Sequence, residues 1–286
     1  MAFKYINPGY AELLSVRGGT TVTGEQYSKT GISFWQPTSD KGLTISEFPA
    51  ELYGKLDLYF KAPENADRAK LTLAIGGYII VSAETSWRMK GDNNNDTIAT
   101  SDSIRVNAVN TLWFHVKPGQ NNDGIFRALL NEREVYNKQD CSFWYAYSSS
   151  EKTITLYSRT EDVLISNLIL SDEEISPREQ VITLPVKETQ TNMTDCGDGS
   201  YEATAANQEI LQFVDVAALS AQYGADSRVT GISLIGNPAY RTAEGLCALT
   251  AIEKSGGNIT EYGRHIVEQN PTSVVMDARS APMTIA

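Results

Sequence analysis

The sequence predicts an all-β protein that begins with an antiparallel sandwich and continues into a second, mostly β domain. Apolar and polar residues alternate along short runs, which is the period-two pattern of a strand with one buried face. These runs recur roughly every ten residues, as in sandwich proteins, and are separated by Gly, Asn, Asp, Pro and Ser. Helical periodicity is almost absent.

Composition and charge narrow the class of protein. The chain has 286 residues, of which 41% are hydrophobic and 21% charged, so a packed core is expected. The net charge of −11 disfavours a nucleic-acid partner, because proteins that bind phosphate backbones carry positive charge on the binding face. No apolar run is long enough to span a bilayer, and residues 1–8 lack the apolar stretch of a signal peptide. We therefore expect no membrane insertion, and a virion or cell-exterior location reached without a Sec leader, or otherwise a cytoplasmic one.

The first domain is predicted to span residues 1–180. Its clearest strand covers residues 56–61, where Leu56, Leu58 and Phe60 share one face. Residues 121–124 (Asn-Asn-Asp-Gly) predict a hairpin, because these residue types tolerate the positive φ of tight turns. Further strands are expected at residues 71–75, 78–81, 103–106, 111–117, 125–131, 142–147, 153–158 and 163–170.

The residue composition changes after the first domain. Residues 171–179 are predicted to form one capped helical turn, because acidic residues follow Ser171 where the helix dipole favours them. After a strand at 181–186 the chain becomes polar, so residues 181–200 are taken as a linker. The second domain, residues 201–286, is expected to hold a helical turn at 217–223 and strands at 209–214, 229–235, 246–252, 259–267 and 273–277. Its apolar end suggests that the natural chain extends past residue 286.

One stretch of the first domain follows a familiar order. Residues 111–116 (TLWFHV) are an aromatic-rich strand, residues 124–136 are a strand, an Asn turn and a return strand, and residues 163–175 end in an acidic segment. This order resembles the concanavalin A-like lectin/glucanase sandwich, particularly its laminin G-like branch, over residues 3–180. The resemblance implies a jelly roll of two antiparallel sheets, whose loops or concave face often bind glycans in that family. Glu132 stands where the family has a turn glycine.

No catalytic residues are predicted. Glucanases of this fold place two carboxylates on one strand face with a Glu-x-Asp-x-(x)-Glu pattern, and the sequence has none. His115 lies in an aromatic strand and is expected to be a core or sheet-surface residue rather than a catalytic base. Cys141, Cys196 and Cys247 are too widely spaced for a metal cluster or a disulfide framework, so buried or half-buried thiols are expected.

One loop presents oxygen ligands at alternate positions, namely Asp92, Asn94 and Asp96. Calcium prefers such ligands, although Thr97 stands where an EF-hand requires glycine. Two alternatives stay open, an exposed Asn-rich turn with no cofactor and a loop that contacts calcium or a glycan.

Aromatic side chains supply the remaining candidates. Sugars stack their C–H faces on exposed rings, while Asn and Asp accept hydroxyl hydrogen bonds. Trp35 and Trp87 lie beside turn-like segments, whereas Trp113 is expected in the core. The candidate ligand-binding residues are Trp87, Asp92, Asn94, Asp96, Trp35, Asn122 and Asp123, and the candidate metal ligands are Asp92, Asn94 and Asp96.

The sequence therefore predicts a non-enzymatic recognition module that binds carbohydrate, with a cell-surface glycan as partner. Its acidic, Thr-, Asn- and Gly-rich character also fits a phage or prophage tail fibre or a bacterial surface appendage, where a homo-oligomer, by analogy a trimer, is expected. The alternative is a structural sandwich of a virion or appendage without a small-molecule ligand. A polysaccharide-degrading enzyme is the third alternative.

Overall fold

The computed structural model describes most strands of the chain but not every connection. The described residues are 4–9, 20–24, 26–28, 30–35, 43–44, 51–61, 70–74, 78–82, 87–90, 97–98, 105–117, 119–143, 153–158, 163–236, 238–239, 248–255, 257–267, 269, 274–278 and 283–284. The chain divides into two compact units, Met1–Ile182 with Ser233–Ala278 and Thr183–Ile232 with Arg279–Ala286. The domain limits expected from the sequence (1–180, 181–200 and 201–286) stay predictions.

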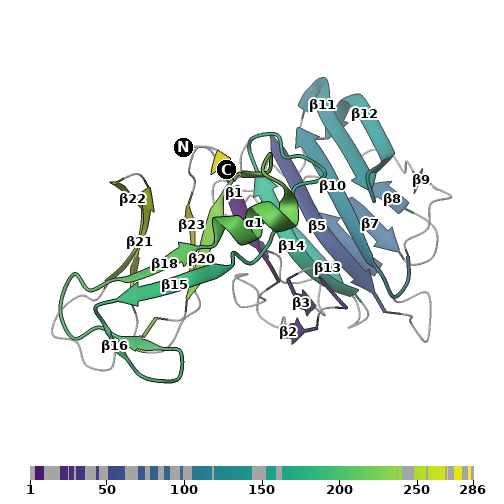
Figure 1. Ribbon diagram of the computed structural model, residues 1–286. Helices are drawn as coiled ribbons and strands as arrows, with labels where there is room; N and C mark the ends of the chain where they lie inside the picture. Colours follow the sequence, from purple (N-terminus) through teal and green to yellow (C-terminus); the bar gives the residue numbers. More distant parts are fainter. Residues whose placement is uncertain are drawn as a thin grey trace. The chain divides into compact units, whose positions relative to one another are not determined.

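An eight-stranded antiparallel sheet is the larger layer of the first unit (Figure 1). Its strands, in spatial order, are β12 (Arg133–Phe143), β11 (Gly119–Leu130), β10 (Val109–Lys117), β5 (Leu52–Phe60), β14 (Val163–Ser171), β3 (Ile32–Trp35) and β2 (Thr20–Thr23), with β1 (Lys4–Asn7) paired to β14. The strands expected at 56–61, 111–117, 125–131 and 163–170 are confirmed.

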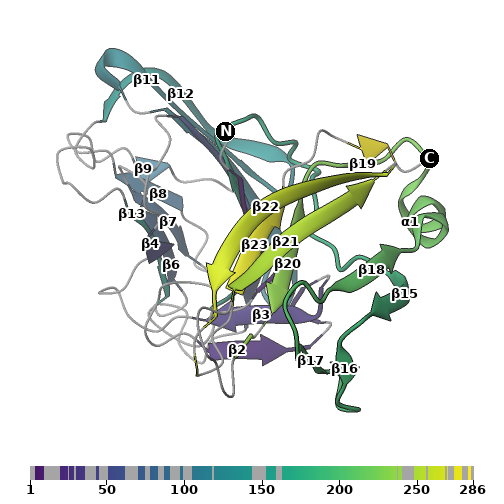
Figure 2. The ribbon, with the colours of Figure 1, turned by 90° about the vertical axis from the view of Figure 1, so that its left-hand side faces the viewer.

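A second antiparallel sheet of six strands completes the sandwich (Figure 2). Its order is β4 (Leu43–Thr44), β13 (Thr153–Ser158), β6 (Lys70–Ala74), β7 (Tyr78–Ser82), β8 (Trp87–Lys90) and β9 (Thr97–Ile98). The predicted all-β, antiparallel sandwich class is confirmed. The strands expected at 103–106 and 142–147 lie largely outside the described residues.

One face of the eight-stranded sheet carries the hydrophobic core. Alternate residues of β5 and β10 point to this face and are fully or almost fully buried, among them Leu52, Leu56, Leu58, Phe60, Leu112, Phe114 and Val116. Phe114 pairs across the strands with Gly54, and a Cβ atom added at Gly54 would lie 2.0 Å from the Phe114 ring. The packing of Phe114 therefore depends on a glycine at this position.

The opposite face, called here the outer face, is partly covered by residues 172–182, the cover segment. Ile175 and Val181 of this segment join a buried cluster with Trp113, Leu129 and Ile169 of the sheet. The indole Nε1 of Trp113 donates a hydrogen bond of 2.9 Å to the Ile175 carbonyl. Trp113 is therefore buried in a core cluster, as the sequence predicts.

The cover segment is neither a helix nor a strand, so the helical turn expected at 171–179 and the strand expected at 181–186 are wrong. The Ser171 hydroxyl accepts from the Glu173 amide over 3.1 Å, which makes a local turn without starting a helix. Further along, the Glu179 carbonyl accepts from the ammonium group of Lys55. The Ile175 and Glu179 carbonyls both accept from side chains of the sheet, and these tertiary contacts override the local helix signal.

The second unit consists of small two-stranded pieces and one helix. Asp215 caps helix α1 (Val216–Tyr223), since its Oδ1 accepts from the Ala218 amide over 3.0 Å, which confirms the helical turn at 217–223. The paired strands are β15 (Val186–Thr191) with β18 (Ile210–Val214), β16 (Thr194–Asp195) with β17 (Tyr201–Glu202), and β19 (Arg228–Val229) with β24 (Met283–Thr284). Cys196 is exposed, against expectation, because it lies in the short connection between β16 and β17.

Two further strand pairs account for the rest of the described chain. They are β20 (Ile232–Gly236) with β23 (Val274–Ala278), and β21 (Ala248–Ser255) with β22 (Asn258–Ile266). The strands expected in these regions are confirmed. Within the described residues, no helix has the length and apolarity that a bilayer crossing requires.

Candidate functional site

A row of four polar side chains crosses the outer face of the eight-stranded sheet. Tyr53 of β5 pairs with His115 of β10, His115 pairs with Arg127 of β11, and Arg127 pairs with Asn137 of β12. Direct cross-strand partners lie on the same face of a sheet. These four residues, called here the cross-strand row, therefore share the face opposite Phe114, with neighbouring strands about 4.8 Å apart.

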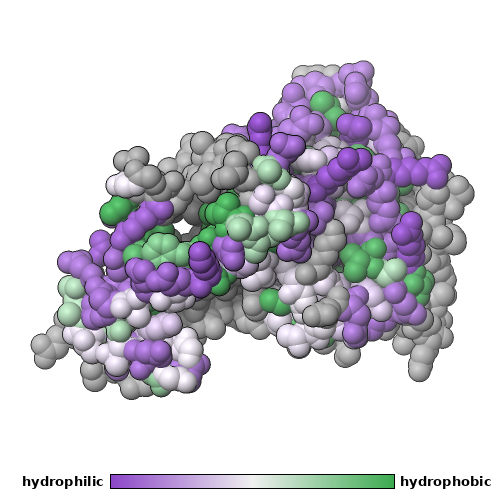
Figure 3. Space-filling view, viewed as in Figure 1, coloured by the Kyte–Doolittle hydropathy of each residue, from purple (hydrophilic) through white to green (hydrophobic). Residues whose placement is uncertain are grey.

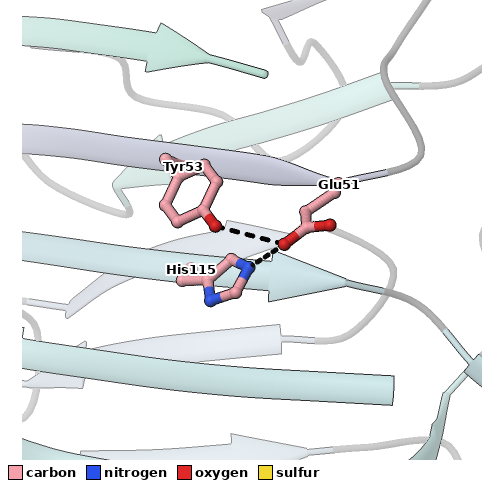
Figure 4. A network of polar contacts seen from close by, with 3 residues as sticks. All are labelled: Glu51, Tyr53 and His115. Carbon is pink, nitrogen blue, oxygen red and sulfur yellow. Dashed lines mark hydrogen bonds and ion pairs between the residues drawn. The ribbon is translucent and has the colours of Figure 1, made fainter. Parts of the chain in front are cut away.

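A carboxylate organises the first end of the row (Figure 4). Glu51 precedes β5, and its Oε1 accepts hydrogen bonds from the Tyr53 hydroxyl at 3.1 Å and from His115 Nε2 at 2.7 Å. An ionised carboxylate can only accept, so Nε2 carries the proton of this bond. The Tyr53 and His115 rings are stacked, with centroids 4.1 Å apart and planes inclined by 8°. Two rings and one carboxylate thus hold each other in place.

A second carboxylate organises the other end. Arg127 Nε donates to Glu134 Oε2 over 2.7 Å, and Asn137 Nδ2 donates to Glu134 Oε1 over 3.2 Å. The Arg127 guanidinium carbon also lies 5.7 Å from the centroid of the Trp113 ring, within cation–π range. Both oxygens of Glu134 are used, and Arg127 is fixed from two sides.

The network sets the ionisation of its members. Burial acts to raise the pKa of Glu51, but hydrogen bonds from His115 and Tyr53, together with the charges of His115 and Lys117, outweigh it and leave this pKa below its usual value. Burial, followed by the charge and hydrogen bond of Glu51, raises the pKa of Tyr53 to about 12. Hydrogen bonds from Arg127 and Asn137 lower the pKa of Glu134. At neutral pH the site therefore holds two carboxylates and a neutral phenol.

The charged side chains of the site are partly exposed to solvent, whereas the histidine is mostly buried. The side chains of Glu51, Arg127 and Glu134 are 37%, 43% and 41% exposed, whereas that of His115 is only 12% exposed. The Tyr53 ring is stacked on that of His115, and its centroid lies 6.3 Å from that of Trp113, with the two planes inclined by 48°. A ring face in contact with another ring is a poor stacking platform, and the exposed side chains of the site are the polar ones.

The structure describes Asn122 and Asp123 among the sequence candidates. Both are exposed and lie near the start of β11, in the stretch between Gly119 and Gly124 where the pairing with β12 shifts its register. β10 and β11 are antiparallel neighbours, with Lys117 opposite Ile125, so the predicted hairpin is confirmed. Asn122 has φ of 60°, the left-handed conformation expected of a turn residue. A ligand-binding role for Asn122 and Asp123 stays a prediction.

The other sequence candidates are only partly described. Trp35 ends β3 and Trp87 begins β8, but the description does not extend to their side chains. Asp92, Asn94 and Asp96 lie outside the described residues, so the calcium alternative stays a prediction. Among the residues that are described, no three His, Cys, Asp or Glu side chains gather as metal ligands would.

Sequence reasoning did not find the cross-strand row. It placed His115 in the core or on a sheet surface, and the structure puts it on the outer face. A local signal existed, because His115 and Arg127 are each polar residues between two buried apolar neighbours. The pairing register that brings them together was not available from the sequence.

Comparisons with known proteins come from structure alone, since no protein-family model and no curated protein sequence matches this chain. Structurally similar chains are carbohydrate-active β-sandwich modules. An endo-β-1,4-glucuronan lyase from the fungus Trichoderma reesei is 10% identical, with a TM-score of 0.46, over 61% of this chain and 98% of that one. The carbohydrate-binding module CBM66 from Bacillus subtilis is 16% identical, with a TM-score of 0.34, over 55% and 98%. Domain 4 of the arabinanase AbnA from Geobacillus stearothermophilus, solved with arabinotriose, is 12% identical, with a TM-score of 0.39, over 61% and 84%.

Proposed function

We propose that the chain is a recognition module that binds a carbohydrate at the cross-strand row, between Glu51 and Glu134. The observation that carries this proposal is the alignment of Tyr53, His115, Arg127 and Asn137 on four adjacent strands. Sugar hydroxyls both donate and accept hydrogen bonds. Arg127 and Asn137 of the row supply donors, and the flanking carboxylates of Glu51 and Glu134 supply acceptors, which is the mixture that a polyol requires.

The site is rigid before a ligand arrives. Every member of the row sits on a strand, and Glu51 and Glu134 each join two of its members by hydrogen bonds. Side chains already fixed in one rotamer lose little entropy when they bind, so such a site binds a flexible oligosaccharide at a lower entropic cost.

The ionisation of the site favours binding over catalysis. A glycosidase of the two-carboxylate type keeps one carboxyl protonated by raising its pKa, but the pKa values of Glu51 and Glu134 are both lowered. A tyrosine acting as a base requires a lowered pKa, and that of Tyr53 is raised to about 12. These directions support a non-enzymatic module.

Binding to an oligosaccharide array, followed by calorimetry with the best ligand, tests the proposal. Glu51→Gln removes the charge of the carboxylate that joins Tyr53 and His115, and we expect it to weaken binding roughly tenfold, as loss of a charge-assisted hydrogen bond does. Glu202→Gln makes the same chemical change in the exposed strand β17 of the second unit and serves as the matched control. Equal affinities of the two variants and the parent chain would place the ligand elsewhere. An array without any bound oligosaccharide would end the proposal.

A structural role in an assembly is the second candidate, and the surface of the second unit favours it. Val186, Ile210, Phe213, Val216 and Tyr223 are all exposed there, and among the described residues of this unit Leu219 alone is a buried apolar side chain. Figure 3 shows apolar surface interspersed with hydrophilic surface. Two-stranded pieces are marginally stable by themselves, so an assembly that covers these residues would stabilise them. A tail fibre or surface appendage on a virion or cell exterior stays our proposal for the setting.

A further inference from the structure

Three cations of the outer face already contact groups of the protein. Arg127 is bonded to Glu134 through its Nε, and Arg178 Nε lies 3.5 Å from Glu132 Oε2. The ammonium group of Lys55 is buried and donates to the Glu179 carbonyl. A site that selects a ligand carboxylate usually presents Arg or Lys with donors and charge to spare. These three cations therefore each have a counter-charge or an acceptor within the protein, whereas Lys117, exposed on the same face, acts on Glu51 through its charge.

The two carboxylates that flank the row add a negative field. Glu51 and Glu134 are both ionised at neutral pH, because both have lowered pKa values. The charge of Glu174 also acts on Tyr53, while Lys117 is the further cation that acts on Glu51. The whole chain carries a net charge of −11, which adds long-range repulsion of anions.

We propose that the cross-strand row selects neutral glycans and discriminates against uronic acid polymers, and this rests on the proposed function. The hydroxyls of a neutral sugar donate hydrogen bonds to Glu51 and Glu134 without cost from charge. The carboxylate of a uronate, in contrast, meets those two anions in a partly desolvated site. Like charges a few ångströms apart repel by about 1 kcal/mol or more, and added salt weakens this repulsion.

The experiment compares two oligosaccharides that differ only at one position of each sugar. A uronic acid oligosaccharide and its carboxyl-reduced counterpart share linkage and length, and both are titrated into the full chain by calorimetry at low and high salt. The glycosidic linkage is chosen from the oligosaccharide array described above, which includes neutral and uronic acid forms of the same backbone. We expect the neutral form to bind at least tenfold more tightly at low salt, and added salt to narrow this ratio.

Two substitutions test the origin of the selectivity. Glu51→Gln and Glu134→Gln remove negative charge with little change of shape, and each is expected to reduce the neutral-to-uronate affinity ratio severalfold. Glu202→Gln is the control that is expected to leave the ratio unchanged. The salt dependence of the parent chain gives a second measure that does not depend on the folding of any variant.

The outcomes separate this inference from the proposed function. A uronate that binds as tightly as its neutral counterpart, or more tightly, overturns the selectivity while the site remains a carbohydrate site. A ratio that neither salt nor the two substitutions change overturns the electrostatic cause. Absence of binding to all oligosaccharides overturns the proposed function, and the selectivity with it.

Discussion

Gly54 is the residue on which the packing of Phe114 depends. Because an added Cβ would meet the Phe114 ring at 2.0 Å, Gly54→Ala is expected to destabilise the fold by roughly 1–3 kcal/mol, the usual cost of overpacking. Urea denaturation measures this loss. Phe114→Leu makes room for the new methyl group, so the double variant is expected to lose less free energy of unfolding than the sum of the two single losses. Strict additivity would contradict the contact.

Tyr53 makes stability depend on pH in the alkaline range. Its pKa is about 12 in the folded chain against 10.0 for the ordinary phenol, so the folded state holds the proton more tightly. The resulting stabilisation is fully present below pH 10 and is lost as the pH rises through about 12. We expect the free energy of unfolding of the parent chain to fall more steeply over this window than that of Tyr53→Phe. Parallel curves for the two proteins would show that Tyr53 titrates normally.

At the scale of elements, the turn between β11 and β12 carries strain. Asn131 and Glu132 have φ of 50° and 67°, the left-handed pair of a two-residue hairpin turn, and glutamate adopts this conformation poorly. Glu132→Gly is expected to stabilise the chain by about 0.5–1 kcal/mol, because relief of strain exceeds the added entropy of the unfolded state. Thermal and urea unfolding measure the gain.

Glu132→Ala is the control for that substitution. It removes the exposed ion pair with Arg178 but keeps a Cβ at positive φ, so no gain is expected. If alanine stabilised the chain as much as glycine, the strain would not be the cause.

Strand existence was predictable from the sequence, whereas strand register and the cover segment were not. The alternation at Leu56, Leu58 and Phe60 is local, and it survives because one face of β5 is buried. The contact of Ile175 with Trp113 joins residues that lie 62 positions apart, so no local sequence pattern predicts it. The same reasoning applies to the cross-strand row, which three separate strand pairings bring together.

At the scale of the whole molecule, the exposed apolar residues of the second unit predict self-association. We expect analytical ultracentrifugation to show a mass above that of one chain, and Phe213→Glu to shift the protein toward the single chain. Phe213 is 43% exposed, so a charge there is expected to disturb association more than folding. Gln212→Glu, one position earlier on β18, is the matched control and is expected to leave the mass unchanged. A parent chain that sediments only as a single chain would contradict this prediction.

The cover segment has a practical consequence for anyone who shortens this protein. β14 ends at Ser171, which looks like a natural place to cut. A truncation there would remove the cover segment from Trp113, Leu129 and Ile169 and expose these apolar side chains on the outer face of the sheet. Such a fragment is expected to aggregate during expression, so any shortened chain should retain the cover segment through Ile182.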